Sequence, residues 1–141
     1  MEIKATLQKP HTDIARADFI VEYNHTLGYI IKETETELQA LGYTDEEREQ
    51  QEKERIAMLS LTGADVERGI YKAKGMDFDD IITYMAQLQP QGLDIKALKI
   101  ELKSNNFYRG NPYVDIVGTL FGFSKEQLDE FFETSDYTKL L

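Results

Sequence analysis

Eleven consecutive residues in the first half of the chain include no apolar side chain. The run extends from Asp45 to Arg55 and contains six acidic and three basic residues. A helix that is polar on every side has nothing to bury in a core, and such helices usually bridge two packed units. Thr44 and Glu47 form a capping box, which predicts that a helix begins here. We therefore expect two packed units joined by a polar helix rather than one continuous core.

The patterns on either side of this run predict an α+β fold that is mainly helical. We place a strand–helix–strand unit at residues 1–43, the polar connecting helix at residues 44–60 and a helical domain at residues 61–141. The whole chain has 141 residues, which is about the size of a typical domain. It contains no cysteine, so disulfides, thiolate metal sites and cysteine nucleophiles are excluded.

The N-terminal unit is predicted from two different periodicities. Alternation of Ile3, Ala5 and Leu7 with polar residues predicts a strand over residues 2–9 with these three side chains inward. Spacings of three and four then predict a helix that begins near Thr12 or Asp13 and ends before Gly28; its predicted inner face consists of Ile14, Ala17, Ile20, Val21, Asn24 and Leu27. A second strand is expected over residues 29–34, and residues 35–41 fit either more strand or a short helical turn. Because two strands alone are marginal in water, a later segment or a second copy of the chain must cover this unit.

Helix-capping residues divide the C-terminal domain into about five short helices. The predicted caps are Thr62, Asp77, Asp94, Asn111 and Ser124. Apolar residues at helical spacing predict the core: Val66, Ile70, Tyr71, Phe78, Ile81, Ile82, Met85, Ile95, Leu98, Leu102, Tyr113, Ile116, Val117, Leu120, Phe121, Leu128, Phe131 and Phe132.

The net charge of −10 disfavours nucleic acid and anionic lipid as partners, since both require a basic surface. No apolar run approaches the ~18 residues that a membrane span needs, so we expect no membrane association. The first residues lack the basic and then apolar layout of a signal peptide, so a cytoplasmic location is expected.

A helix-turn-helix pattern runs from Asp115 to Phe132, with Gly122 at the turn. The positions expected to be buried are Val117, Phe121, Phe123, Leu128 and Phe131. A DNA reader would present basic or amide side chains from the second helix, but this helix presents Glu126, Asp129, Glu130 and Glu133, with Lys125 and Gln127 as the only suitable groups. A structural hairpin is therefore favoured over a DNA-binding regulator.

No residue constellation predicts catalysis, a cofactor or a metal. Asp77, Asp79 and Asp80 resemble metal ligands, but the chain continues as helix interior, so a helix cap is the simpler interpretation. His11 and His25 fall at opposite ends of one predicted helix and cannot share a metal within the chain. Phosphate-binding glycine motifs are absent. We therefore expect a protein that is not an enzyme and has no catalytic, cofactor-binding or metal-binding residues.

The most distinctive short segment is Phe107–Pro112, in which two aromatics and an arginine precede a turn. Aromatic residues and arginine are enriched in protein interfaces, which makes this segment a candidate contact surface together with the next aromatic residue; the candidates are Phe107, Tyr108, Arg109, Asn111 and Tyr113. The alternative is that Phe107 lies in the core and that Arg109 pairs with a nearby acid such as Asp115. The sequence favours neither interpretation.

Several of these segments resemble small proteins of tailed phages and prophages of Gram-positive bacteria. The resemblance covers roughly residues 44–136 and rests on Glu52–Thr62, Asp65–Ile70, Phe107–Pro112 with Asp115 and Gly118, and Gly122–Ser124 with Gln127–Glu133. The N-terminal unit is similar, less specifically, to the first part of such chains. Proteins of this kind are described as hypothetical or as accessory to tail or tail-fibre assembly. No catalytic residues come with the resemblance.

The resemblance implies a non-enzymatic phage protein that acts through protein–protein contacts, in an assembly or tail-accessory role. Its expected partners are phage structural proteins, and its expected location is the host cytoplasm or the virion. The acidic composition leaves open an inhibitor or regulator of a nucleic-acid-binding protein, and the helix-turn-helix spacing leaves open a DNA-binding regulator. We also expect a homodimer that associates through the N-terminal strands.

Overall fold

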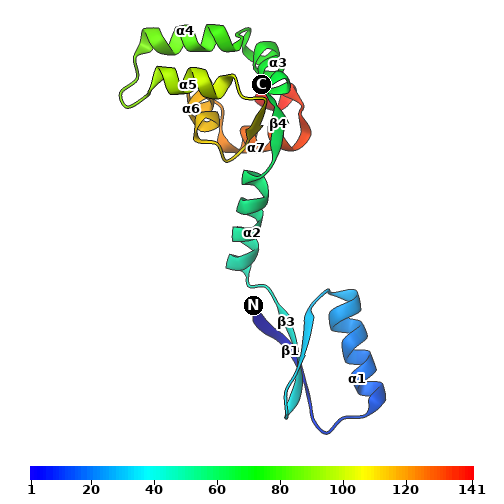
Figure 1. Cartoon of the computed structure of the whole chain (residues 1–141). Coiled ribbons are helices and arrows are strands. Elements are labelled where there is room, and N and C mark those ends of the chain that lie inside the picture. The colour runs from blue at the N-terminus through cyan, green and yellow to red at the C-terminus, as the bar shows by residue number, and fades with distance from the viewer. The chain divides into compact units, whose positions relative to one another are not determined.

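The computed structural model describes all residues 1–141 and divides them into two compact units, Met1–Glu52 (unit 1) and Lys53–Leu141 (unit 2). The chain is α+β and mainly helical, as the sequence predicts. The boundary between the units falls inside helix α2 (Asp45–Ala57), which has no buried residue. This helix ends three residues earlier than predicted, because strand β4 begins at Ser60 (Figure 1).

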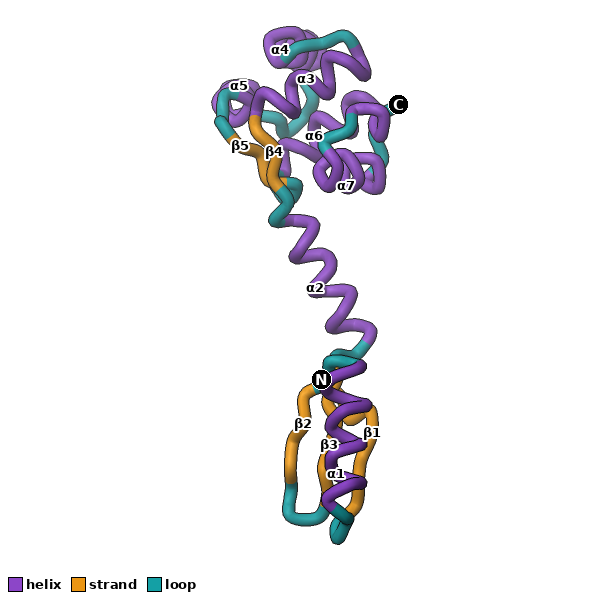
Figure 2. Tube along the Cα trace, turned by 90° about the vertical axis from the view of Figure 1, so that its right-hand side faces the viewer, coloured by secondary structure: helices purple, strands orange, loops and turns teal.

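Unit 1 consists of a three-stranded antiparallel sheet and one helix. The elements are β1 (Glu2–Gln8), α1 (Asp13–Ile20), a π-helical continuation over Val21–Thr26, β2 (Ile30–Glu33) and β3 (Glu37–Gly42). The strand order is β1-β3-β2, with β3 in the middle (Figure 2). The segment at residues 35–41 that the sequence left ambiguous is thus mostly a strand, and it occupies the centre of the sheet.

The prediction that Ile3 points inward is wrong, because a β-bulge interrupts β1. Ala5 and Leu7 pair with the buried residues Ala40 and Leu38, and they face α1 as expected. The register shifts between Ile3 and Ala5, so that Ile3 pairs with Leu41 on the opposite face of β3. Strict alternation cannot reveal such a shift, since one extra residue reverses the direction of every side chain beyond it.

The predicted inner face of α1 is also wrong. Phe19 is buried against the sheet and Tyr23 is half-buried beside it, with ring centroids 4.7 Å apart. Ile14, Ala17 and Val21, which were expected to be inside, are exposed. Aromatic rings bury more area than an isoleucine or a valine, so the face with Phe19 and Tyr23 packs against the sheet. The helix consequently has a second apolar face that its own unit does not cover.

Unit 2 contains the five helices that the sequence predicts, together with a two-stranded ladder that it does not. The helices are α3 (Gly63–Lys74), α4 (Phe78–Leu88), α5 (Ile95–Leu102), α6 (Pro112–Phe121) and α7 (Lys125–Thr134). A short 3₁₀ helix follows at Tyr137–Leu140. Strand β4 (Ser60–Thr62) pairs with β5 (Asn106–Tyr108) in antiparallel orientation. The two strands are far apart in sequence and only three residues long, so no local pattern marks them.

The predicted caps are confirmed at each of the helices α3 to α7. The side chains of Thr62, Asp77, Asp94, Asn111 and Ser124 each accept a backbone N–H from the first turn. Most of the predicted core is buried or half-buried, but Tyr71 is exposed because α3 turns Val66 and Ile70 inward instead. Val114, which was not predicted, is buried.

Substitution of Gly69 by alanine is expected to destabilise unit 2, although alanine favours helices by ~1 kcal/mol over glycine. A Cβ atom at this position would lie 2.4 Å from Cζ of Phe131. Phe131 is itself buried, so its ring cannot move away cheaply. Overpacking of this kind costs about 1–3 kcal/mol. Urea unfolding should show that Gly69→Ala is less stable than the unmodified chain, and that the same substitution costs less in a chain that also carries Phe131→Leu. A Gly69→Ala protein more stable than the unmodified chain would contradict this packing.

Candidate protein-contact site

The segment from Phe107 to Tyr113 lies mostly inside unit 2. Phe107 is 2% exposed and packs edge-to-face with Phe78, whose ring centroid is 5.8 Å away. Tyr113 is half-buried, and Asn111 caps α6 while its amide donates to Glu101. Of the five candidates, Tyr108 alone is largely exposed, at 51%. The segment therefore exposes Tyr108, and the other four candidates pack within the unit.

Arg109 is buried to 7% exposure and is held by two carboxylates and one carbonyl. Its Nε donates to Oδ1 of Asp129 at 2.7 Å, and its Nη1 donates to Oδ1 of Asp115 at 3.0 Å. Nη2 approaches the backbone oxygen of Lys125 at 3.5 Å. This one guanidinium thus links β5 to α6 and α7. The alternative interpretation of the sequence, with Phe107 in the core and Arg109 paired with Asp115, describes this geometry.

The Arg109 cluster also corrects the prediction for the α6–α7 hairpin. Val117, Leu128 and Phe131 are buried as predicted, and Gly122 adopts the left-handed conformation at the turn. Phe121 and Phe123 are half-buried. Asp129, which was expected on the exposed acidic face, is instead half-buried because it pairs with Arg109. The exposed acids of α7 are Glu126, Glu130 and Glu133.

Tyr108 is the exposed residue of the β4–β5 ladder. It pairs with Ser60, and the backbone N–H of Gly110 donates to the carbonyl of Ala57. Met58, in the turn between α2 and β4, is exposed as well.

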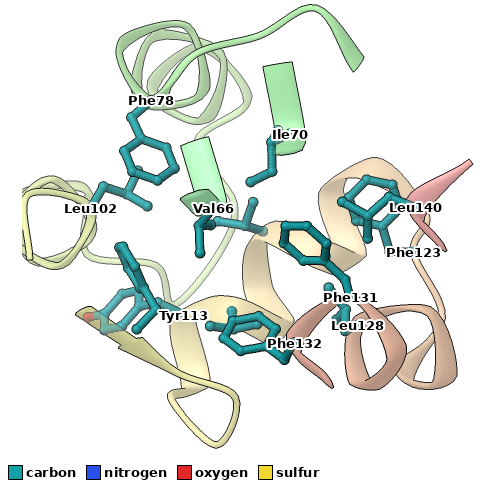
Figure 3. A pocket seen from close by; sticks show the side chains of 14 residues that line it. Val66, Ile70, Phe78, Leu102, Tyr113, Phe123, Leu128, Phe131, Phe132 and Leu140 are labelled. Atoms are coloured by element: carbon teal, nitrogen blue, oxygen red, sulfur yellow. The ribbon is translucent and has the colours of Figure 1, made fainter. Parts of the chain in front are cut away.

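Two of the hollows in unit 2 differ in their relation to solvent. The first is a cavity of about 30 Å³ in the core, lined almost wholly by apolar side chains (Figure 3). A space of this size and lining is a packing void rather than a ligand site. The second is an open groove of about 380 Å³ between α6 and the end of α4. Its lining contains no charged side chain: Met85, Leu88, Pro90, Gln91, Gly92, Leu93, Ile116, Thr119 and Leu120.

The titratable groups do not converge on a site. Three or more potential metal ligands gather nowhere in the structure, and Asp77 and Asp80 form a capping box at α4. The Arg16 guanidinium, which donates a hydrogen bond to Glu33, lowers the pKa of that carboxyl, and Arg68 lowers the pKa of Asp65 in the same way. Both acids lie in ion pairs with these arginines at the surface. Such shifts reflect local pairing rather than the preparation of a catalytic group.

The uncovered face of α1 is the most exposed apolar feature of unit 1. It consists of Ile14, Ala17 and Val21, which we call the α1 stripe. Ile14 is 75% exposed, the highest value among the large apolar residues of the protein. Carboxylates border the stripe on the same helix: Asp13, Asp18 and Glu22. The stripe is therefore an apolar surface with an acidic margin.

Comparison of the chain with protein-family models, with curated proteins and with solved structures finds no match. No helix of the structure is both long enough and apolar enough to cross a bilayer. The interpretation of the surfaces above therefore depends on their own geometry and charge.

The helical spacing of Ile14, Ala17 and Val21 predicts that they lie in the core, whereas the structure places them at the surface. The signal that could have corrected this was present, because Phe19 and Tyr23 provide a second apolar line four residues apart on the same helix. These two apolar lines lie on opposite sides of the helix. Only one line can face a single sheet, so the other needs a different neighbour.

Proposed function

We propose that this protein is not an enzyme and acts through protein–protein contacts, as an assembly or tail-accessory factor of a tailed phage. The observation that carries the proposal is the α1 stripe. A single isolated apolar residue on a surface needs no explanation, but three aligned on a helix whose opposite side is already buried form a surface suited to a partner.

The margin of the stripe indicates what kind of partner fits it. Asp13, Asp18 and Glu22 flank the apolar residues, and acids outnumber bases twelve to five within residues 1–52. A helix with an apolar line binds in an apolar groove, and these carboxylates favour a groove with basic groups along its rim. The proposed partner is therefore a protein with such a groove.

The phage setting is supported by the resemblance of segments in residues 44–136 to small phage and prophage proteins. In that setting the partner is a structural protein of the phage, and the protein acts in the host cytoplasm or on the virion. Tyr108 on β5, Met58 in the turn after α2 and the uncharged groove beside α6 are further exposed surfaces in unit 2 that an assembly factor can use.

A second candidate function is an acidic regulator of a nucleic-acid-binding protein. The excess of carboxylates in unit 1 favours it, because carboxylates can occupy the sites that bind phosphates in a basic protein. Such binding weakens steeply as salt rises, since surface charges are screened beyond ~10 Å at 0.1 M salt. Binding that depends mainly on the apolar stripe changes less with salt.

Binding to purified phage structural proteins tests the proposal. We expect the double variant Ile14→Gln/Val21→Gln to bind its partner at least ~10-fold more weakly than the unmodified chain, since central apolar residues contribute most of the binding energy at interfaces. A matched control is Tyr71→Gln/Ile100→Gln, which removes two exposed apolar residues of unit 2. Isothermal titration calorimetry at two salt concentrations measures the dissociation constant of each variant and its dependence on salt.

Two results would count against the assembly role. Failure of every structural protein to bind would contradict it directly. Binding only to a nucleic-acid-binding protein, with a steep loss at high salt, would favour the regulator instead.

A further inference from the structure

We propose that the outer face of the β1-β3-β2 sheet docks against the same face of a second copy of the chain. This face lies opposite α1, which covers the inner face through Phe19. Unit 1 has only three buried apolar side chains, namely Phe19, Leu38 and Ala40. A core this small stabilises a unit of about fifty residues poorly. Burial of the outer face of the sheet would therefore add to the stability of unit 1.

One apolar row crosses the outer face. Leu41 in the central strand pairs with Ile3 on one side and with Ile30 on the other. Ile3 is 53% exposed and Ile30 is 51% exposed, while Leu41 between them is half-buried. The bulge in β1 creates this row, because without the register shift Ile3 would point towards α1. The row is thus a product of the fold, and its three residues come from three strands.

The rest of the outer face carries few charges. The next row consists of Thr6, Gln39 and Lys32, and the row after it pairs Gln8 with Glu37. One cation and one anion balance on this face, whereas unit 1 as a whole has an excess of seven acids. Charged residues are depleted in interface cores in the same way. A second copy of an acidic protein can therefore approach here without strong repulsion.

The row is symmetric about the central strand, which selects a second copy as the occupant. A two-fold axis that runs along β3 between two apposed sheets places Ile3 of one copy opposite Ile30 of the other. The same axis places Leu41 opposite Leu41, and Thr6 opposite Lys32. Each apolar side chain of the row meets an apolar side chain. The axis also places Glu37 opposite Glu37, and each of these carboxylates accepts a hydrogen bond from the Gln8 amide of its own chain. Interfaces of two-fold dimers require this self-complementarity, and packed sheets lie face to face at about 10 Å.

Edge-to-edge pairing of the strands, by contrast, is disfavoured. The bulge beside Lys4 disrupts the free edge of β1, and Lys9 and Pro10 follow at its end. Bulges, lysines and prolines are the devices by which natural sheets block edge pairing. The other edge strand, β2, is only four residues long. The N-terminal strands thus associate through a face rather than through an edge.

The α1 stripe is not part of this dimer. Its acidic margin would meet an identical acidic margin in a second copy, which opposes self-association there. The dimer and the proposed partner binding therefore use opposite sides of unit 1. An experiment can therefore disprove the dimer without disproving the partner binding, and the reverse is also true.

Sedimentation equilibrium of the 141-residue chain tests the dimer. We expect the unmodified chain to dimerise, and Ile3→Glu and Ile30→Lys each to raise the dimer dissociation constant at least ~10-fold, since a charge facing isoleucine must lose water without a partner. The double variant Ile3→Glu/Ile30→Lys should recover most of this loss, because the two-fold axis brings the new carboxylate opposite the new ammonium. Within one chain these two positions are two strand spacings apart, about 10 Å, and interact weakly.

Ile14→Glu on the α1 stripe is the matched control, and it should leave the dissociation constant unchanged. Circular dichroism of each variant shows whether unit 1 has folded, and both test residues are exposed in the monomer. A strict monomer, or a dimer that tolerates both single variants, would overturn the proposal. Failure of the double variant to recover would overturn the two-fold arrangement.

Discussion

Replacement of both acids that hold Arg109, by Asp115→Ala with Asp129→Ala, should lower the free energy of unfolding of unit 2 by about 3–5 kcal/mol. The guanidinium is buried, and these two carboxylates are its only ionic partners. Without them a positive charge remains inside the unit with the carbonyl of Lys125 as its nearest acceptor. An uncompensated buried charge is among the most costly defects that a substitution can create.

Removal of the arginine itself should cost less than removal of its acids. In Arg109→Met the two carboxylates that remain are 47% and 34% exposed, so water can solvate them. We expect a loss of about 1–3 kcal/mol, which is the usual cost of breaking hydrogen bonds around partly buried groups. The triple variant, which combines all three substitutions, should then be more stable than the double acid variant because it contains no buried charge.

Urea unfolding followed by far-ultraviolet circular dichroism measures these differences. The matched control is Glu126→Ala/Glu130→Ala, which removes two exposed acids of α7 and should change stability by no more than about 1 kcal/mol. A double acid variant as stable as this control would show that Arg109 is not the link between β5 and the hairpin. A triple variant less stable than the double one would contradict the electrostatic explanation.

Phe107→Ala is expected to destabilise unit 2 by about 3–5 kcal/mol, the usual cost of removing a buried phenylalanine ring. The ring lines the core cavity and packs against Phe78. Its loss enlarges an existing void, which the surrounding helices cannot fill without moving. Urea unfolding again provides the measurement.

The neighbouring residue is the control for this prediction. Tyr108→Ala removes an exposed ring from the same strand and should cost no more than about 1 kcal/mol. If Tyr108→Ala destabilised the unit as much as Phe107→Ala, the assignment of Phe107 to the core and Tyr108 to the surface would be wrong.

The helices of unit 2 could be predicted because their signals are local. Asp77 and Ser124 cap backbone N–H groups within their own first turns, so the four or five residues around each cap contain the information. Gly75 and Gly122 end helices in the left-handed conformation for the same local reason. Neither kind of signal depends on where the rest of the chain lies.

The errors lie where the fold depends on distant residues. Ile3 points outward because of a register shift against β3, almost forty residues away. The two apolar faces of α1 compete for one sheet, and the local sequence does not determine which of them packs against it. The ladder of β4 with β5 and the pairing of Asp129 with Arg109 join segments that sequence periodicity treats separately.

In the candidate site, too, local sequence signals were sufficient for some features, whereas others depended on contacts with distant residues. The composition of Phe107–Pro112 marks the segment as unusual, but its tertiary contacts place Phe107 and Arg109 in the interior. The spacing of the α1 stripe marks it as apolar, but predicts the wrong side of the helix. Composition therefore located both features, and packing decided their roles.

Photo-crosslinking in infected or prophage-carrying cells tests the central claim most directly. A photoreactive residue at Ile14 or at Ala17 should crosslink one phage protein, and the same residue at Ile100 in unit 2 should not. This result is expected if the α1 stripe binds a partner protein. Equal crosslinking at all three positions, or no protein crosslinked from the stripe, would contradict the account.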